Sequence, residues 1–131
     1  MLIIDASTLC EVVARTERGA RIQLRLVQDS TYAAPHIIDV EVLGTIRRLF
    51  LLGKLDRTAA TLAVEELRDW PGERFAHRGL LVRAWQLRDN VRTWDAMYVA
   101  LAELLQATLI TTDERLSRVT GLACTVEVAP D

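Results

Sequence analysis

Two short runs of branched apolar residues each lead to an aspartate. Leu2–Ile4 leads into Asp5, and Thr108–Thr111 leads to Asp113. Runs of this length and composition are typical of buried strands in a parallel sheet. A third short segment, residues 125–128, is expected to form an edge strand.

Between these runs the apolar positions recur at helical spacing. The expected helices cover residues 18–27, 37–52, 56–67, 80–87, 94–105 and 114–119. Gly53 ends the second of them, and Asp56 and Thr93 are expected to cap the third and the fifth. Strands that alternate with helices predict an α/β fold in which a central, mainly parallel sheet is flanked by helices.

Length and composition favour one folded unit. The chain has 131 residues, of which 50% are hydrophobic and 26% are charged, so we expect a single domain over residues 1–131. The formal net charge of -2 gives no general attraction for polyanions. Binding of nucleic acid would therefore depend on local groups of basic residues.

Cysteine placement and apolar run length indicate the compartment. Cys10 and Cys124 lack the spacing of a zinc site, which makes reduced thiols the simpler expectation. The first apolar run ends at Asp5, which is too short for a signal peptide, and no later run reaches a membrane-spanning length. We expect a cytoplasmic protein without a membrane segment.

Four carboxylates are candidates for one site. Asp5 and Asp113 follow strands directly, and ligands of parallel sheets usually bind where such strands end. Glu41 and Asp95 share helix faces with apolar residues and are expected to point inward. Inward carboxylates are costly without a partner, and a shared divalent cation such as Mg²⁺ would satisfy them.

Each of these acids also has a structural alternative. An aspartate at a strand end or in a first helical turn commonly caps the helix or interacts with its dipole. The remaining acids in turns or on polar helix faces are expected to be solvated, namely Asp29, Asp39, Glu65, Glu66, Asp69 and Glu103.

Four segments together resemble the PIN-domain nucleases, and within them the VapC-type toxins of bacterial toxin-antitoxin pairs. The segments are IIDAS at residues 3–7, DVEV at 39–42 before Arg47-Arg48, DAMYVALAE at 95–103 and LITTD at 109–113. The resemblance spans essentially the whole chain, and its specificity lies in the order and spacing of the four.

The resemblance implies a PIN-like three-layer α/β fold and endoribonuclease activity that depends on Mg²⁺ or Mn²⁺. It also implies an RNA substrate, a homodimer and a cognate VapB-type antitoxin, whose basic residue reaches the acidic pocket in the family. The family's acidic residues fall on Asp5, Glu41, Asp95 and Asp113, and its supporting hydroxyls on Ser7 and Thr111. Many relatives carry another acid or amide just beyond the fourth aspartate, where this chain has Glu114 and Ser117.

Arginines and apolar residues suggest contacts with RNA and with partners. Candidates for RNA binding are Arg15, Arg18, Arg47, Arg92, Arg115 and Arg118, each of which could equally belong to a solvated helix face. Residues 49–52, Trp70 and Trp85 offer large apolar side chains for a partner, although core packing is their commoner use.

Two other functions remain open at this stage. A catalytically inactive PIN-like interaction protein would share the fold without the chemistry. A receiver-type metal-binding signalling module also gathers acids at strand ends, but it needs a lysine after a late strand. The single lysine of this chain, Lys54, lies elsewhere.

Overall fold

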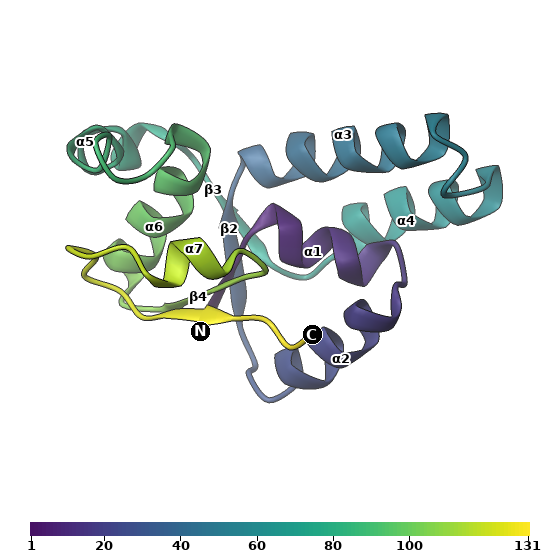
Figure 1. The fold of residues 1–131 in the computed structure, drawn as a ribbon, viewed down its shortest axis with the longest axis horizontal. Helices are drawn as coiled ribbons and strands as arrows, with labels where there is room; N and C mark the ends of the chain where they lie inside the picture. Colours follow the sequence, from purple (N-terminus) through teal and green to yellow (C-terminus); the bar gives the residue numbers. More distant parts are fainter.

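The computed structural model describes residues 1–131, built around a five-stranded sheet (Figure 1). The strands are β1 (Leu2–Ile4), β2 (Tyr32–Pro35), β3 (Glu73–Phe75), β4 (Thr108–Thr111) and β5 (Val126–Val128). All neighbouring strands pair in parallel, in the order β3-β2-β1-β4-β5. The expected α/β fold with a parallel central sheet is confirmed.

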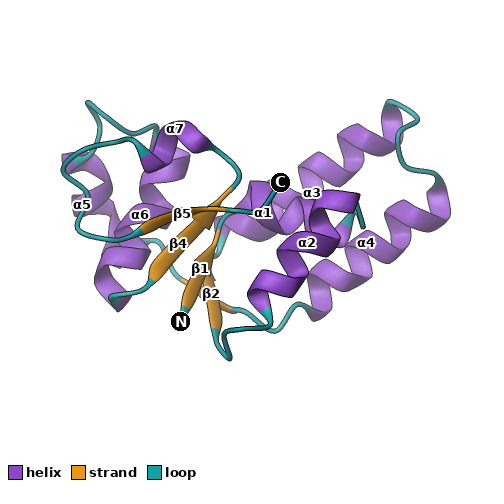
Figure 2. Cartoon of the chain, turned by 60° about the horizontal axis from the view of Figure 1, so that its bottom comes forward, coloured by secondary structure: helices purple, strands orange, loops and turns teal.

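Helices cover both sides of this sheet (Figure 2). They are α1 (Ala6–Val13), α2 (Glu17–Leu26), α3 (Ile37–Leu51), α4 (Arg57–Asp69), α5 (Leu81–Gln86), α6 (Thr93–Leu105) and α7 (Glu114–Ser117), with a short 3-10 turn, η1 (Arg78–Leu80), before α5. Helix α6 packs against β1, β2 and β4, whereas α1 contacts β4 and helices α2, α3 and α4. The α3–α4 hairpin extends away from the sheet (Figure 1).

The core fixes the two strands that lead to the candidate site. Ile3, Ile4, Leu109 and Ile110 are fully buried, as are most of the apolar residues of α6 that pack on them. Thirty buried apolar residues form one contiguous cluster. Asp5 and Asp113 therefore leave a rigid part of the molecule at the same edge of the sheet.

Two strands were missing from the sequence-based expectation. In β2, Ala33 and Ala34 are fully buried, and such small residues give no signal of strand-forming propensity. In β3, Glu73 and Arg74 are polar because the strand lies at the sheet edge and is only partly covered. Both strands are specified by packing and pairing with neighbours rather than by local preference.

The six expected helices are present with ends within two residues of the prediction, whereas no range was predicted for α1, and one predicted cap is wrong. Asp56 accepts the Ala59 N–H at 2.8 Å, and Gly53 adopts a positive φ of 73° just after α3. Thr93 is wrong as a cap, because it is already helical and Arg92 holds the cap position without a side-chain bond. No helix has the length and hydrophobicity needed to cross a membrane.

Two expectations about the surface also change. Trp70 is half-buried and packs on the core beside Tyr32, so it is not a free partner surface. Glu103 was expected to be solvated, but its side chain is only 9% exposed. It accepts a 2.6 Å bond from Arg83 and a 2.7 Å bond from the Ala123 N–H, and so ties α5 and α6 to the segment before β5.

Candidate active-site cleft

A cleft of about 720 Å³ opens where β1 and β4 end. Its walls come from the start of α1, one side of α3, the first turns of α6 and the residues after β4. All four candidate carboxylates line it: Asp5, Glu41, Asp95 and Asp113. Acids that are far apart in the sequence are thus brought to one surface.

Asp5 is the most deeply placed of the four, with 5% of its surface exposed. It caps α1 by accepting the Thr8 N–H at 2.9 Å and also accepts the Ser7 hydroxyl at 2.8 Å. Both of these bonds end on Oδ1. Burial raises the pKa of Asp5 above its ordinary value, although the Thr111 hydroxyl and the Thr8 and Ser7 bonds lower it in part.

Glu41 reaches the cleft from α3 and meets a residue of α6. The hydroxyl of Tyr98 donates a 2.8 Å hydrogen bond to Oε1 of Glu41. Burial raises the pKa of Glu41, and the negative charges of Asp5 and Asp95 raise it further, whereas the bond from Tyr98 lowers it. The inward orientation expected for this side chain is confirmed.

Asp95 and Asp113 lie nearer the rim and are held by arginines. Arg92 donates to Asp95 at 3.3 Å, and Arg115 donates to both carboxylate oxygens of Asp113 at 3.2 Å. The side chains of these acids are 27% and 31% exposed. The bond from Arg115 holds the pKa of Asp113 below its ordinary value.

Comparison with known proteins decides the family. The family model described as the PIN domain matches residues 2–122. The chain belongs to the PIN-domain family. Among curated relatives, Ribonuclease VapC3 of Mycobacterium tuberculosis is 40% identical over 118 residues, which cover 89% of this chain and 85% of that protein. Ribonuclease VapC1 of the same organism is 34% identical over 127 residues, 96% of each chain.

Solved structures support the PIN-domain fold. Mycobacterium tuberculosis VapC20, described as a sarcin-ricin loop cleaving toxin, aligns with a TM-score of 0.73 at 16% identity over 99% of this chain and 100% of that one. VapBC2 from Rickettsia felis, bound to a DNA fragment from its promoter, aligns with a TM-score of 0.68 at 12% identity over 97% of both chains. At these identities the likeness concerns the fold, and the receiver-type alternative is excluded by the family.

The donor set of this PIN domain suits a hard divalent cation, although its acids are not gathered into a finished site. No three Asp, Glu, His or Cys side chains lie close enough together to hold one ion. Two of the acids are instead turned toward arginines at the rim. Burial raises the pKa of both inner acids, Asp5 and Glu41, and the charge of Asp5 raises the pKa of Glu41 further, which is the condition that a cation would relieve.

The supporting hydroxyls lie beside the acids in this PIN domain. Ser7 donates to Asp5 and also accepts the Thr112 N–H at 3.3 Å, which connects the ends of β1 and β4. Thr111 is fully buried and accepts the Asp113 N–H at 3.1 Å. Neither Glu114 nor Ser117 lines the cleft, since Glu114 pairs with Arg118 and the Ser117 hydroxyl bonds to its own helix.

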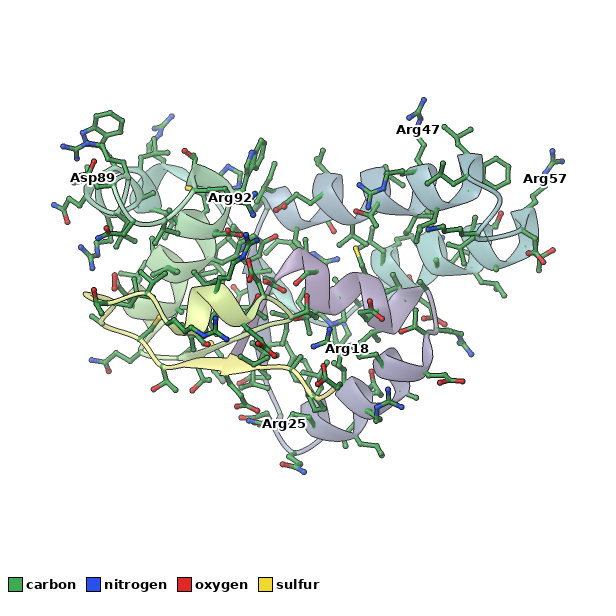
Figure 3. The ribbon with its side chains drawn as sticks, viewed as in Figure 1. Arg18, Arg25, Arg47, Arg57, Asp89 and Arg92 are labelled. Atoms are coloured by element: carbon green, nitrogen blue, oxygen red, sulfur yellow. The ribbon has the colours of Figure 1, made fainter.

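The predicted arginines are distributed unevenly around the cleft. Arg92 lines the cleft, and Arg115 lines a smaller hollow beside it together with Asp95 and Asp113. The other four lie elsewhere: Arg15 pairs with Glu66, Arg18 bonds to the carbonyls of Ala129 and Pro130, Arg47 borders a groove between α3 and α4, and Arg118 pairs with Glu114. Figure 3 shows Arg92 far from Arg47, which points away from the molecule.

The sequence reasoning missed several polar residues of the cleft, among them Glu11, Tyr98 and Arg48. Tyr98 lies three positions after Asp95, so the same helical phase that turned Asp95 inward could have indicated it. Arg48 lines the cleft seven positions after Glu41, which is two helical turns along the same face. It was passed over in favour of its neighbour Arg47, and the phase of α3 would have separated them.

Proposed function

We propose that this chain is a divalent-metal-dependent endoribonuclease and the toxin component of a VapBC-type pair. The observation that carries the proposal is the convergence of four carboxylates, from four separate parts of the chain, on one cleft with arginines at its rim. Curated relatives that match nearly the whole chain are named as VapC ribonucleases, which supports the same activity. Residues 1–131 act in this proposal as one nuclease domain.

The proposed metal ligands are Asp5, Asp95 and Asp113, with Glu41 either binding the metal or orienting the attacking water. A bound Mg²⁺ or Mn²⁺ supplies Lewis acidity toward the scissile phosphate and lowers the pKa of a water molecule. Binding requires Asp95 and Asp113 to turn from Arg92 and Arg115, whose side chains are largely exposed, so that their ion pairs are weak and easily broken.

The chain's own residues then have separate tasks. Ser7 and the α1 cap hold Asp5 in one orientation, and Tyr98 holds Glu41. Arginines released from the acids remain beside the cleft, where guanidinium groups suit the phosphate oxygens of RNA. Hydrolysis leaves a 5′-phosphate and a 3′-hydroxyl end in this scheme, as the family resemblance implies.

The proposed partners are a VapB-type antitoxin, the RNA substrate and a second copy of this chain. Solved relatives include a VapBC2 complex and a toxin-antitoxin complex from Klebsiella pneumoniae, which supports an antitoxin. Phe50, Leu51 and Leu52 at the end of α3 are between 40% and 62% exposed and offer an apolar contact surface. Because its substrate is cellular RNA, we place the activity in the cytoplasm.

Cleavage of RNA in the presence and absence of metal tests the proposal. The purified protein should cleave RNA in the presence of Mg²⁺ or Mn²⁺, and cleavage should stop when EDTA is added. Asp5→Asn should be inactive under all these conditions, because it removes the most buried acid of the set. Cleavage that survives chelation or this substitution would contradict the metal mechanism, and a protein that neither cleaves RNA nor binds metal would be the inactive interaction protein.

A further inference from the structure

The three tryptophans differ in what covers their rings. Trp70 stacks with Tyr32 and has the Arg74 guanidinium 4.9 Å from its ring centre. Trp85, on α5, has the Arg88 guanidinium 4.5 Å from its ring centre. No aromatic ring or arginine stacks on Trp94. Trp94 is 57% exposed and its ring has no stacking partner, so it offers open ring surface.

Trp94 also occupies a distinctive place, because it lines the same cleft as the four carboxylates. It stands on the first turn of α6, directly before Asp95. The cleft carries two arginines, Arg92 beside Trp94 and Arg48 on α3. An uncovered indole, positive charge and the proposed metal ligands thus share one surface.

This combination matches the chemistry of single-stranded RNA. Proteins bind unpaired nucleotides by stacking bases on aromatic rings while arginines contact the neighbouring phosphates. Bases in a duplex are stacked on each other and do not present a free face, whereas loops and single strands do. A basic protein segment could meet the acids of this cleft, but it would be repelled by Arg48 and Arg92, whereas RNA phosphates pair with both. The arginines beside the uncovered ring therefore favour RNA at Trp94.

We propose that Trp94 is a base-binding residue, on which an unpaired nucleobase stacks next to the phosphate to be cut. The inference rests on the proposed ribonuclease function and adds a substrate class to it, namely RNA with at least one unstacked base at the cleavage site. Asp95 is the next residue in the sequence, and the other three carboxylates line the same cleft. A base that stacks on Trp94 would therefore place its adjoining phosphate beside these carboxylates.

Binding measurements with cleavage switched off test this contact. Asp5→Asn serves as the parent, and its affinity for a short fluorescein-labelled single-stranded RNA is measured by fluorescence anisotropy. Adding Trp94→Leu should weaken binding about 5- to 150-fold, the range expected for one base stacked on an aromatic ring. Trp94→Phe keeps an aromatic face and should restore most of the affinity.

Trp85→Leu is the matched control, because Trp85 is also an exposed tryptophan but lies outside the cleft. It should leave RNA affinity unchanged. RNA whose central nucleotides are abasic should bind the parent and the Trp94→Leu protein equally, since no base remains to stack. In the Trp85→Phe protein, Trp70 and Trp94 remain and only Trp94 lines the cleft, so the intact RNA should quench part of the tryptophan fluorescence and the abasic RNA should not.

The outcomes separate this inference from the proposed function. If the wild-type protein cleaves RNA with metal but Trp94→Leu binds as well as its parent, the stacking contact is wrong and the nuclease stands. If Trp94→Leu weakens binding of intact and abasic RNA alike, Trp94 does not recognise a base. If it weakens only the binding of a protein partner, Trp94 belongs to a protein interface. Failure of the wild-type protein to bind or cleave RNA would overturn both proposals.

Discussion

The phenol of Tyr98 donates its hydrogen bond to Glu41 from the opposite wall of the cleft, at 2.8 Å. Tyr98 is 2% exposed and belongs to the core, so it is held firmly by the packing of α6 against the sheet. Glu41 is longer and less buried. Because Tyr98 is fixed by core packing, its hydrogen bond holds the Glu41 carboxylate in one of the several orientations that the side chain could adopt.

Tyr98→Phe should lower the cleavage rate about 10-fold or more, because partners that orient the ligands of a metal site commonly have effects of this size. The bond from Tyr98 lowers the pKa of Glu41, so its loss raises that pKa. A base with a higher pKa loses its charge at a higher pH, and the acid limb of the pH–rate profile should shift upward. The profile is measured with Mg²⁺ held constant.

Tyr32→Phe provides the comparison for Tyr98→Phe. The Tyr32 hydroxyl donates to the carbonyls of Leu26 and Asp29, outside the cleft. Its loss should reduce thermal stability without moving the acid limb. An unshifted limb in Tyr98→Phe, together with a normal rate, would show that this bond has no part in the reaction.

Asp5→Asn should stabilise the metal-free protein at neutral pH while it abolishes cleavage. Burial raises the pKa of Asp5 in the folded chain, so the folded state holds this proton to a higher pH than the unfolded state does. The contribution of Asp5 to the free energy of unfolding therefore falls as the pH rises, and it is lost once the pH exceeds the pKa of Asp5 in the folded state. Asparagine avoids that loss and still caps α1, and its melting temperature in EDTA at pH 7.5 should be a few degrees higher.

Two further observations test the same explanation of Asp5. The difference in melting temperature should shrink as the pH falls below the raised folded pKa and should close near the ordinary pKa of 3.8, below which Asp5 is neutral in both the folded and the unfolded state. Adding Mn²⁺ should raise the melting temperature of the wild type and leave the variant nearly unchanged. A variant that melts below the wild type in EDTA at neutral pH would mean that the Asp5 charge is already satisfied by the protein.

The sequence predicted the acids of the cleft better than it predicted their partners. Asp5 and Asp113 follow apolar strands, and Glu41 and Asp95 have a clear helical phase, so local pattern alone indicated where each would point. The Tyr98–Glu41 bond joins residues 57 positions apart. Such a contact depends on how two helices pack, which no local pattern contains.

The same distinction explains the other differences. The Arg92–Asp95 and Arg115–Asp113 pairs are local, but their formation depends on the direction of exposed side chains rather than on periodicity. Glu103 looked solvated because its helix position is polar, yet α5 and the segment before β5 cover it. Strands β2 and β3 were missed because their residues are small or polar and are specified by their neighbours in the sheet.

Arg115→Gln should increase the affinity for Mn²⁺ about 2- to 5-fold. Arg115 holds both oxygens of Asp113, and a cation must compete with that pair. Arg115 is exposed, and an exposed ion pair is weak because solvent screens it, so the gain in affinity should stay this small. Isothermal titration of the RNA-free protein measures it.

Arg118→Gln is the control for Arg115→Gln, because Arg118 pairs with Glu114 outside the cleft on the same short helix. Its affinity for Mn²⁺ should equal that of the wild type. Weaker binding in Arg115→Gln would reverse the interpretation, since Arg115 would then orient Asp113 for the metal rather than compete with it.

Arg48→Gln should weaken RNA binding and reduce its dependence on salt. Arg48 lines the cleft and, unlike Arg92 and Arg115, forms no ion pair, so its charge is free for a phosphate. Each lost phosphate contact lowers the slope of log K against log salt by about 1. Arg57→Gln is the control, because Arg57 points into solvent at the far end of the α3–α4 hairpin (Figure 3). If both variants keep the wild-type slope, the RNA backbone does not pass Arg48.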